Sequence, residues 1–148
     1  MDGAGFNARA SDTVMQDMWE KFAQLGVGAG ITCLMRTSIG DIMAAPGGRD
    51  ATLRLFDECG AVASAAGFRP RDAFVQNSLA LVTAAGSPLK WSMLRDIERG
   101  STTEGEHILG DMVARPTRSA SRHRSWSWLA RMSRHMKSAV LAPRLICN

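Results

Sequence analysis

The sequence predicts an all-α fold, a helical bundle, on three observations. Apolar residues recur at helical spacing in several segments, clusters of glycine and proline separate those segments, and no segment alternates apolar and polar residues as a half-buried strand would. A chain of 148 residues is also the size of one ordinary domain. We therefore expect one core, surrounded by helices that short loops connect.

The first expected helix runs from about residue 12 to about residue 35, with Ser11 or Asp12 at the capping position. Its core face is predicted from apolar residues at helical spacing: Met15, Met18, Trp19, Phe22 and Leu25. A short helix is expected around Ile39 to Ala45. Two glycines and a proline at residues 46–48 then predict a break in regular structure.

Asp50 is placed to cap a third helix, which Gly67 closes. One face of this helix is apolar, with Leu53, Phe56, Val62 and Ala63. A fourth helix is expected from near Pro70 to the break at Gly86. Lys90 to Glu98 predict a fifth helix that ends at Gly100, and Ser101 or Thr102 begins a last one through Ile108 and Leu109.

We divide the chain into a start predicted to be disordered (1–11), a helical domain (12–114) and a basic tail (115–148). The composition becomes strongly basic near residue 115, and the helical apolar period ends there. The tail carries eight of the 18 lysines and arginines and no acidic residue, and Trp126 and Trp128 interrupt its basic and serine residues. One interpretation is a segment that binds an acidic partner or nucleic acid, through phosphate contacts and stacked indoles. The other is a disordered extension without function.

The cysteines and the start of the chain indicate a cytoplasmic protein. Cys33, Cys59 and Cys147 are odd in number and widely spaced, without a Cys-x-x-Cys pair, so we interpret them as reduced thiols. Residues 1–10 lack the basic and apolar pattern of a signal peptide, and no apolar stretch is long enough to span a bilayer. We expect no association with a membrane.

Lys21 is a candidate catalytic residue because Trp19 and Phe22 flank it in the first helix. Partial desolvation of an ammonium group lowers its pKa and makes it a better proton donor. The alternative is a solvated helix lysine, which is the usual environment of this residue type.

Glu104 follows Ser101 by three residues, which is the spacing of a capping box at a helix start. A capping role accounts for this glutamate fully, and ligand binding is the alternative. Glu104 and His107 also form one Glu-x-x-His step, but a di-metal bundle needs two such steps and further glutamates. We therefore expect no metal site.

The run Gly26-Val27-Gly28-Ala29-Gly30 contains the glycine spacing of a dinucleotide-binding loop without its context. Such a loop needs a preceding strand and a helix that opens after the glycines, whereas here a helix precedes them. The run is instead typical of close helix packing or a helix kink.

A set of short motifs runs in order from about residue 12 to about residue 114: Trp19-Glu20-Lys21, Gly40-Asp41, Asp57-Glu58, Ala66-Gly67, Ser92-Met93-x-x-Asp96, Thr103-Glu104 and Gly110. This ordered set resembles the C-terminal domain of ketopantoate reductases. The resemblance implies the helical fold of that domain, which the wider 6-phosphogluconate-dehydrogenase-like group shares. It also implies a cytoplasmic oxidoreductase that reduces a 2-keto acid with NADPH in pantothenate biosynthesis, as a 2-dehydropantoate 2-reductase does.

The same resemblance implies roles for three residues. Lys21 would protonate the carbonyl oxygen as hydride arrives from NADPH, Ser92 would bind the carboxylate end of the substrate, and Glu104 would contact the cofactor. A developing alkoxide needs such a proton donor and fixed dipoles. The family's glycine-rich Rossmann domain is absent from this sequence, so we expect the chain alone to be an inactive fragment, with a homodimer or a separately encoded Rossmann chain as partner.

Two departures from the family pattern carry further expectations. Leu25, Ala29 and Ile39 stand where family members carry substrate-binding asparagines, and Trp91 replaces a serine beside Ser92, so a less polar 2-keto acid or a lost activity is expected. The family's apolar C-terminal ending is missing, but the codons of Trp126-Ser127-Trp128, read in the frame two bases on, give Val followed by Leu, Met or Val when Ser127 has a UCN codon. We interpret residues 115–148 as a frameshifted, disordered tail. A non-catalytic helical interaction module with a basic tail is the alternative function.

Overall fold

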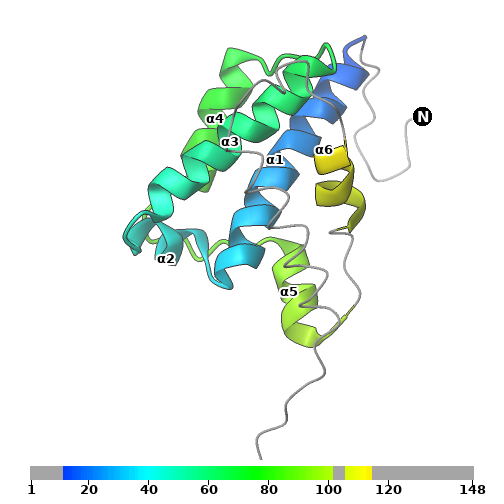
Figure 1. Cartoon of the computed structure of the whole chain (residues 1–148). Helices are drawn as coiled ribbons and strands as arrows, with labels where there is room; N and C mark the ends of the chain where they lie inside the picture. Colours follow the sequence, from blue (N-terminus) through cyan, green and yellow to red (C-terminus); the bar gives the residue numbers. More distant parts are fainter. Residues whose placement is uncertain (1–11, 102–105, 115–148) are drawn as a thin grey trace, which may run out of the picture.

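The computed structural model describes residues 12–101 and 106–114, and within these ranges it contains helices and no strand (Figure 1). The predicted all-α fold is therefore confirmed. The helices, in chain order, are α1 (Val14–Met35), α2 (Ile39–Ala44), α3 (Gly48–Ala65), α4 (Asp72–Val82), α5 (Ser92–Arg99), the π-helix η1 (Glu106–Gly110) and α6 (Asp111–Ala114).

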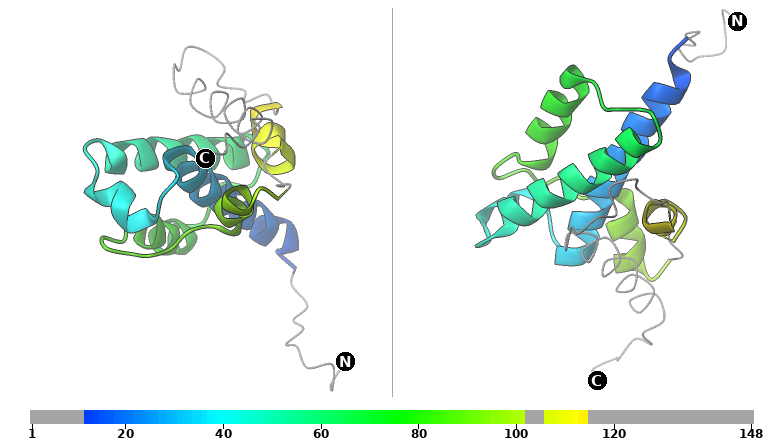
Figure 2. Two further views of the ribbon diagram at one scale, coloured as in Figure 1. Left: turned by 90° about the horizontal axis from the view of Figure 1, so that it is seen from below. Right: turned by 45° about the horizontal axis from the view of Figure 1, so that its top comes forward.

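Helix α1 is the centre of the domain, because α2, α3, α4, α5 and η1 all pack against it. Its most extensive contact is with α3, which crosses it, and α6 lies close to both helices (Figure 2). The buried core is drawn from most of these elements, and its largest fully buried side chains are Ile31, Ile39, Ile42, Leu94, Met112, Val27, Val62, Val82 and Thr32. One long helix thus fixes the positions of all the others.

The glycine-rich run lies inside α1 and is buried, which confirms the close-packing interpretation. A Cβ at Gly26 would lie 2.5 Å from Sδ of Met112 and 3.1 Å from Sγ of Cys59. The absence of a side chain at Gly26 therefore lets α3 and α6 approach the backbone of α1 closely. Glycine in a helix interior costs conformational entropy, and this contact is what it provides here.

Two predicted helix starts are wrong. Helix α1 begins after Thr13, whose side chain forms no cap hydrogen bond, so neither Ser11 nor Asp12 occupies the capping position. Helix α3 begins at Gly48 with Gly47 as its N-cap, and Asp50 lies in its first turn. The glycines begin this helix because Gly47 has a φ of 76° and a Cβ at Gly48 would lie 1.8 Å from the Ile42 carbonyl oxygen.

The fourth helix begins at Asp72 and ends at Val82, inside the predicted limits of Pro70 and Gly86. The helix begins later than predicted because the backbone just before it forms hydrogen bonds with side chains of α1. The Gln16 side chain donates a hydrogen bond to the Arg69 carbonyl at 2.9 Å, and the Arg71 amide donates one to Glu20 at 2.8 Å.

Helix α5 ends at Gly100, as predicted, where a φ of 70° closes it. The expected last helix is a π-helix turn, Glu106–Gly110, followed by α6. The capping box assigned to Ser101 and Glu104 lies outside the described residues, because residues 102–105 are not among them, and so do the disordered start and the basic tail. No helix within the described ranges is both long and apolar enough to cross a membrane.

Candidate functional site

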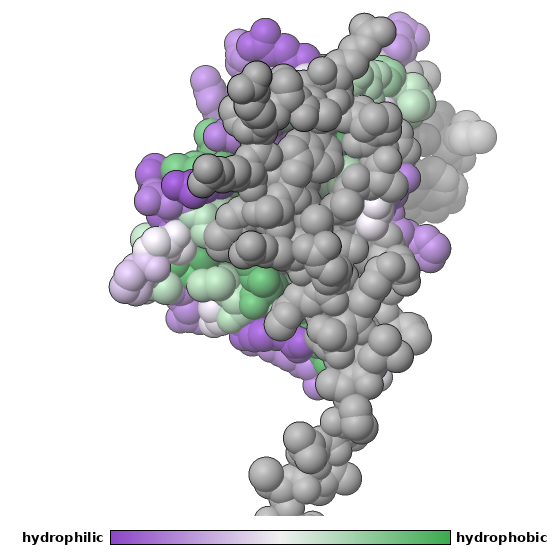
Figure 3. All heavy atoms as spheres, viewed as in Figure 1, coloured by the Kyte–Doolittle hydropathy of each residue, from purple (hydrophilic) through white to green (hydrophobic). Residues whose placement is uncertain are grey.

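Lys21 lies on the exposed side of α1, where apolar residues flank it on one side and Asp17 and Gln24 on the other. Val14 and Met18 are 55% and 57% exposed, and they precede Lys21 by seven and three residues, so they share its side of the helix. Figure 3 shows hydrophobic surface where α1 begins, at the upper right. Within the described ranges Lys21 forms no salt bridge. The ammonium group of Lys21 is thus exposed beside apolar side chains and has no ion-pair partner among residues 12–101 and 106–114.

The residue next to Lys21, Glu20, is a buried carboxylate that a partly exposed ion cluster holds in place. Glu20 is only 3% exposed, and its carboxylate accepts hydrogen bonds from Nε and the backbone amide of Arg71, at 2.9 and 2.8 Å. The Arg71 guanidinium also pairs with Asp17, one turn earlier on α1. Gln16 donates a further bond to Glu20 at 3.0 Å. Arg71 thus joins the first turns of α1 to the start of α4.

This cluster changes the ionisation of its members. The hydrogen bonds from the Arg71 side chain lower the pKa of Glu20, although burial of the carboxyl acts in the opposite direction. The same carboxylate, together with Asp17, raises the pKa of Arg71. Glu20 is therefore charged at neutral pH, and the turn of α1 that carries Lys21 is anchored.

Ser92 is exposed and is the first residue of α5, and the side chain of the preceding Trp91 contacts α1. A Cβ at Gly28 would lie 2.2 Å from Cε2 and Cζ2 of Trp91, so the indole ring lies directly against the Gly28 backbone. Gly28 is seven residues from Lys21, which is about two helical turns on the same side. The contact brings the start of α5 to the side of α1 that carries Lys21. No hydrogen bond or ion pair joins Lys21 to Ser92.

The loop before α5 is held by the start of α2. The amides of Ile39 and Gly40 donate hydrogen bonds to the carbonyls of Leu89 and Ser87, at 3.0 and 2.8 Å. A Cβ at Gly40 would lie 2.6 Å from the backbone of Gly86 and of Ser87. Glycine at position 40 therefore permits the approach that places Trp91 and Ser92.

Asp41, which follows Gly40 in the motif, stabilises the beginning of α2. Its carboxylate accepts hydrogen bonds from the hydroxyls of Ser38 and Thr37, both at 2.6 Å, and its amide donates one to the Ser38 hydroxyl at 3.3 Å. These bonds, the one from Ser38 first, lower the pKa of Asp41. The Gly40-Asp41 pair is thus a structural feature that supports the loop carrying Ser92.

The three positions that depart from the family's asparagines have different environments. Ala29 is 1% exposed and Ile39 is completely buried, and both belong to the core cluster. Leu25 is half-buried and lies between Lys21 and Gly28 on the same side of α1. Of the three, Leu25 alone retains a partly exposed side chain beside the candidate site.

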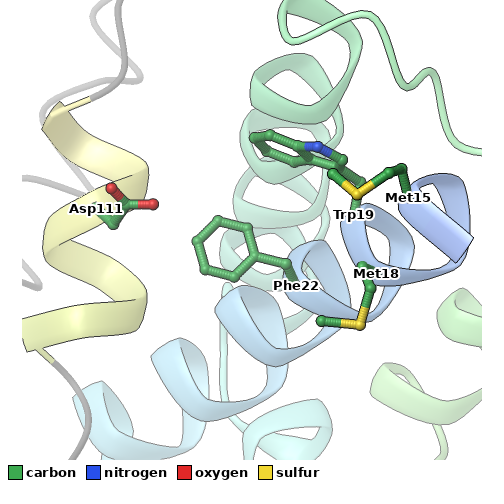
Figure 4. Close-up of a pocket in the computed structure, with 5 residues that line it drawn as sticks. All are labelled: Met15, Met18, Trp19, Phe22 and Asp111. Carbon is green, nitrogen blue, oxygen red and sulfur yellow. The ribbon is translucent and has the colours of Figure 1, made fainter.

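A pocket of about 320 Å³ lies on a neighbouring side of α1 and faces α6. Met15, Met18, Trp19, Phe22 and Asp111 line it, with the two aromatic rings directed toward α6 (Figure 4). Trp19 packs edge-on against Phe22 and is stacked on Phe68, with ring centroids 5.8 Å apart in both pairs. Apolar walls and a carboxylate disfavour an anionic ligand, so this pocket does not suit a keto acid.

Glu104, the third sequence-predicted site residue, lies outside the described residues. Lys21 and Ser92 are both exposed on helices that pack against each other, and Trp91 forms the contact between those helices. Within residues 12–101 and 106–114, no cluster of three or more His, Cys, Asp or Glu residues is arranged to hold a metal ion.

Comparison with known proteins identifies the family. The family described as ketopantoate reductase PanE/ApbA C terminal matches residues 13–124, which is more than half of the chain. The chain belongs to this family. Among curated proteins, it is 33% identical over 108 residues to the uncharacterized oxidoreductase YkpB of Bacillus subtilis (strain 168), in a match that covers 73% of this chain and 36% of YkpB.

Two solved structures of similar proteins share the helical fold. The 2-dehydropantoate 2-reductase of Methylococcus capsulatus is 27% identical with a TM-score of 0.75, and the match covers 97% of this chain and 46% of that one. The PanE/ApbA family ketopantoate reductase of Ralstonia eutropha JMP134 is 20% identical with a TM-score of 0.76, and the match covers 93% and 46%. The chain thus spans less than half the length of these relatives.

Arg71 is the site residue that sequence reasoning missed. It lies 51 positions from Glu20, in a loop with no motif of its own, so only the tertiary structure brings the two together. The signal that points to Arg71 is the burial of Glu20, which only the structure shows. A buried carboxylate requires a cationic partner.

Proposed function

We propose that this domain is the substrate-binding and proton-donating half of an NADPH-dependent reductase of a 2-keto acid, of the 2-dehydropantoate 2-reductase type. The observation that carries the proposal is Lys21, which is exposed beside the apolar Val14 and Met18 on a helix turn that Glu20 and Arg71 anchor. Membership of the family supports it, as does the likeness to a protein named 2-dehydropantoate 2-reductase.

In this proposal Lys21 holds the proton that the reaction consumes. NADPH, when bound, supplies the hydride that reaches the carbonyl carbon. The carbonyl oxygen then takes a proton from Nζ of Lys21, and the product is a 2-hydroxy acid. The Ser92 hydroxyl donates a hydrogen bond to the substrate carboxylate, and Glu104 has the role of a cofactor contact that the family resemblance implies.

The described residues do not form a dinucleotide site, because they contain no strand followed by a glycine-rich turn. We therefore assign the holding of NADPH to a Rossmann domain, in the same polypeptide or as a separately encoded chain. The exposed Val14 and Met18 beside Lys21 suit contact with such a domain, since it would bury them and exclude water from the reaction. A homodimer and a cytoplasmic location complete the proposal, and the free thiols of Cys33 and Cys59 are consistent with a reducing compartment.

The test compares the 148-residue chain with a fusion in which the nucleotide-binding domain of the Methylococcus capsulatus relative precedes it. With ketopantoate and phenylglyoxylate as alternative substrates, we expect no NADPH oxidation above background from the chain alone, because positioning of the nicotinamide against the substrate is missing. The fusion should oxidise NADPH, and Lys21→Met should lower kcat by about 10²- to 10⁴-fold.

Leu81→Ala is the matched control, because Leu81 is an exposed α4 residue outside the candidate site, and its kcat should not change. Turnover by the chain alone would contradict the assignment of NADPH to another domain. Equal activity of the fusion with lysine or methionine at position 21 would contradict the role of Lys21.

A further inference from the structure

Leu25 and Trp91 are two partly accessible apolar residues near the side of α1 that carries Lys21. Lys21, Leu25 and Gly28 follow one another at helical spacing on one side of α1. The indole of Trp91 lies against Gly28, about 10 Å along the helix axis from Lys21 at ~1.5 Å per residue. Both Leu25 and Trp91 are half-buried, so each has an accessible portion beside the site.

Neighbouring residues hold the indole of Trp91 in place. Trp91 packs against the hydrophobic core, and the loop that precedes it is bonded to Ile39 and Gly40. Gly28 accommodates the ring because it has no side chain, and its carbonyl accepts a hydrogen bond from Thr32 at 2.7 Å. A rigid aromatic ring therefore adjoins Ser92, which is the expected contact of the substrate carboxylate.

A ligand between Lys21 and the start of α5 meets few polar groups on α1. Leu25 is apolar, the Gln24 side chain donates a hydrogen bond to Ser78 of α4 at 3.3 Å, and Gly28 is covered by the indole. Ala29 and Ile39 are buried in the core. A short or hydroxylated 2-keto acid would find no hydrogen-bond partner in this stretch for its side chain, whereas an aromatic ring would bury apolar area and stack on Trp91.

We propose that Trp91, together with Leu25, selects a 2-keto acid with an aromatic side chain. The inference rests on the proposed function, since Lys21 defines where the carbonyl lies. Trp91 acts here as a specificity-determining residue, because it contacts the side chain of the substrate and takes no part in proton transfer.

The test uses the full 148-residue chain and two probes, phenylglyoxylate and pyruvate, in titrations followed by the backbone amide resonances of Lys21 and Gly28. Phenylglyoxylate should bind at least about tenfold more tightly than pyruvate, because differences in apolar fit of this size are worth at least that factor. Trp91→Ser should bring the ratio of the two dissociation constants close to one. Trp91→Phe should preserve the preference.

A second pair of variants separates the surface from general destabilisation. Leu25→Asn should lower the preference for phenylglyoxylate, whereas Leu81→Asn, the same change at an exposed position on α4, should leave it unchanged. Far-UV circular dichroism and thermal unfolding establish that each variant is folded.

Three results would overturn one or both proposals. Equal affinity for the two acids, with both lost in Lys21→Met, overturns the aromatic preference and supports the proposed function. Phenylglyoxylate binding that needs Trp91 but not Lys21 supports the aromatic surface and overturns the role of Lys21. No shift at Lys21 or Gly28 with either acid overturns both.

Discussion

At the scale of single residues, three glycines in long helices differ in what surrounds them. A Cβ at Gly28 would meet the rigid indole of Trp91 at 2.2 Å, and one at Gly26 would meet the flexible end of Met112 at 2.5 Å. A Cβ at Gly60, in α3, would have nothing within 4 Å. The same substitution therefore tests packing at the first two sites and intrinsic helix propensity at the third.

We predict that alanine is stabilising at Gly60, destabilising at Gly26 and most destabilising at Gly28, as measured by the free energy of unfolding. Gly60→Ala should stabilise by about 0.5–1 kcal/mol because alanine favours the helix. Gly28→Ala should destabilise by about 1–3 kcal/mol because the indole must move, and Gly26→Ala should cost less because the Met112 thioether can rotate away. Urea denaturation measures all three, and a stabilising Gly28→Ala would contradict the placement of Trp91.

The ion pair of Glu20 with Arg71 makes the stability of the fold depend on pH. Arg71 lowers the pKa of Glu20 in the folded state, so the unfolded state binds a proton more readily. The stabilisation is therefore fully present above the unfolded pKa of Glu20, near 4.5, and is lost as the pH falls through the lower, folded value.

We expect Glu20→Gln to remove part of the loss of stability on acidification, and urea denaturation at a series of pH values down to the acid range measures it. Asp72→Asn, on the exposed start of α4, is the control, because Asp72 is not a member of the ion cluster of Asp17, Glu20 and Arg71. An acid response that is the same in wild type and Glu20→Gln would contradict the ion cluster.

At the scale of elements, the loop at residues 86–89 and the start of α2 form one unit. Gly40 permits their backbones to meet, and the Leu89 and Ser87 carbonyls accept hydrogen bonds from Ile39 and Gly40. This unit fixes the beginning of α5, and thereby Trp91 and Ser92, relative to α1. A site residue is thus positioned by an element that carries no site residue itself.

We predict that Gly40→Ala destabilises the chain by about 1–3 kcal/mol, since the added methyl group would meet backbone atoms, which cannot move aside as a side chain can. Hydrogen exchange should locate the effect, with faster exchange of the Ile39 amide, which bonds to Leu89. Gly60→Ala is the matched control and should not speed that exchange. Unchanged protection of the Ile39 amide in Gly40→Ala would contradict the unit.

At the scale of the whole molecule, two buried thiols report on unfolding of the core. Burial raises the pKa of Cys33 to about 12 and raises the pKa of Cys59 as well, and both side chains are almost inaccessible. A thiol reagent at pH 8 should therefore label them only when the domain opens.

In a Cys147→Ser background, we predict that the labelling rate of Cys33 and Cys59 follows the unfolded population. Gly28→Ala should raise it about tenfold for each 1.4 kcal/mol of destabilisation that denaturation reports. Gly60→Ala should lower it. Rapid labelling of the native wild type would contradict the buried positions of both thiols.

The sequence by itself determined the fold class and most helix ends, because the 3.6-residue apolar period and the glycine breaks are local properties. It also singled out Lys21 and Ser92 as candidate site residues, because the motifs that contain them can be recognised in a single sequence. It misplaced the start of α3, because Gly47 and Gly48 act there through contact with Ile42, and it missed Arg71.

Only the tertiary structure decided the environment of those residues. The pairing of Glu20 with Arg71 and the contact of Trp91 with Gly28 join residues 51 and 63 positions apart. These contacts fix the surroundings of Lys21. Local propensity cannot specify such contacts, because they follow from how the helices pack around α1. The sequence therefore determined which side chains are available for chemistry, and helix packing decided which of them share one surface.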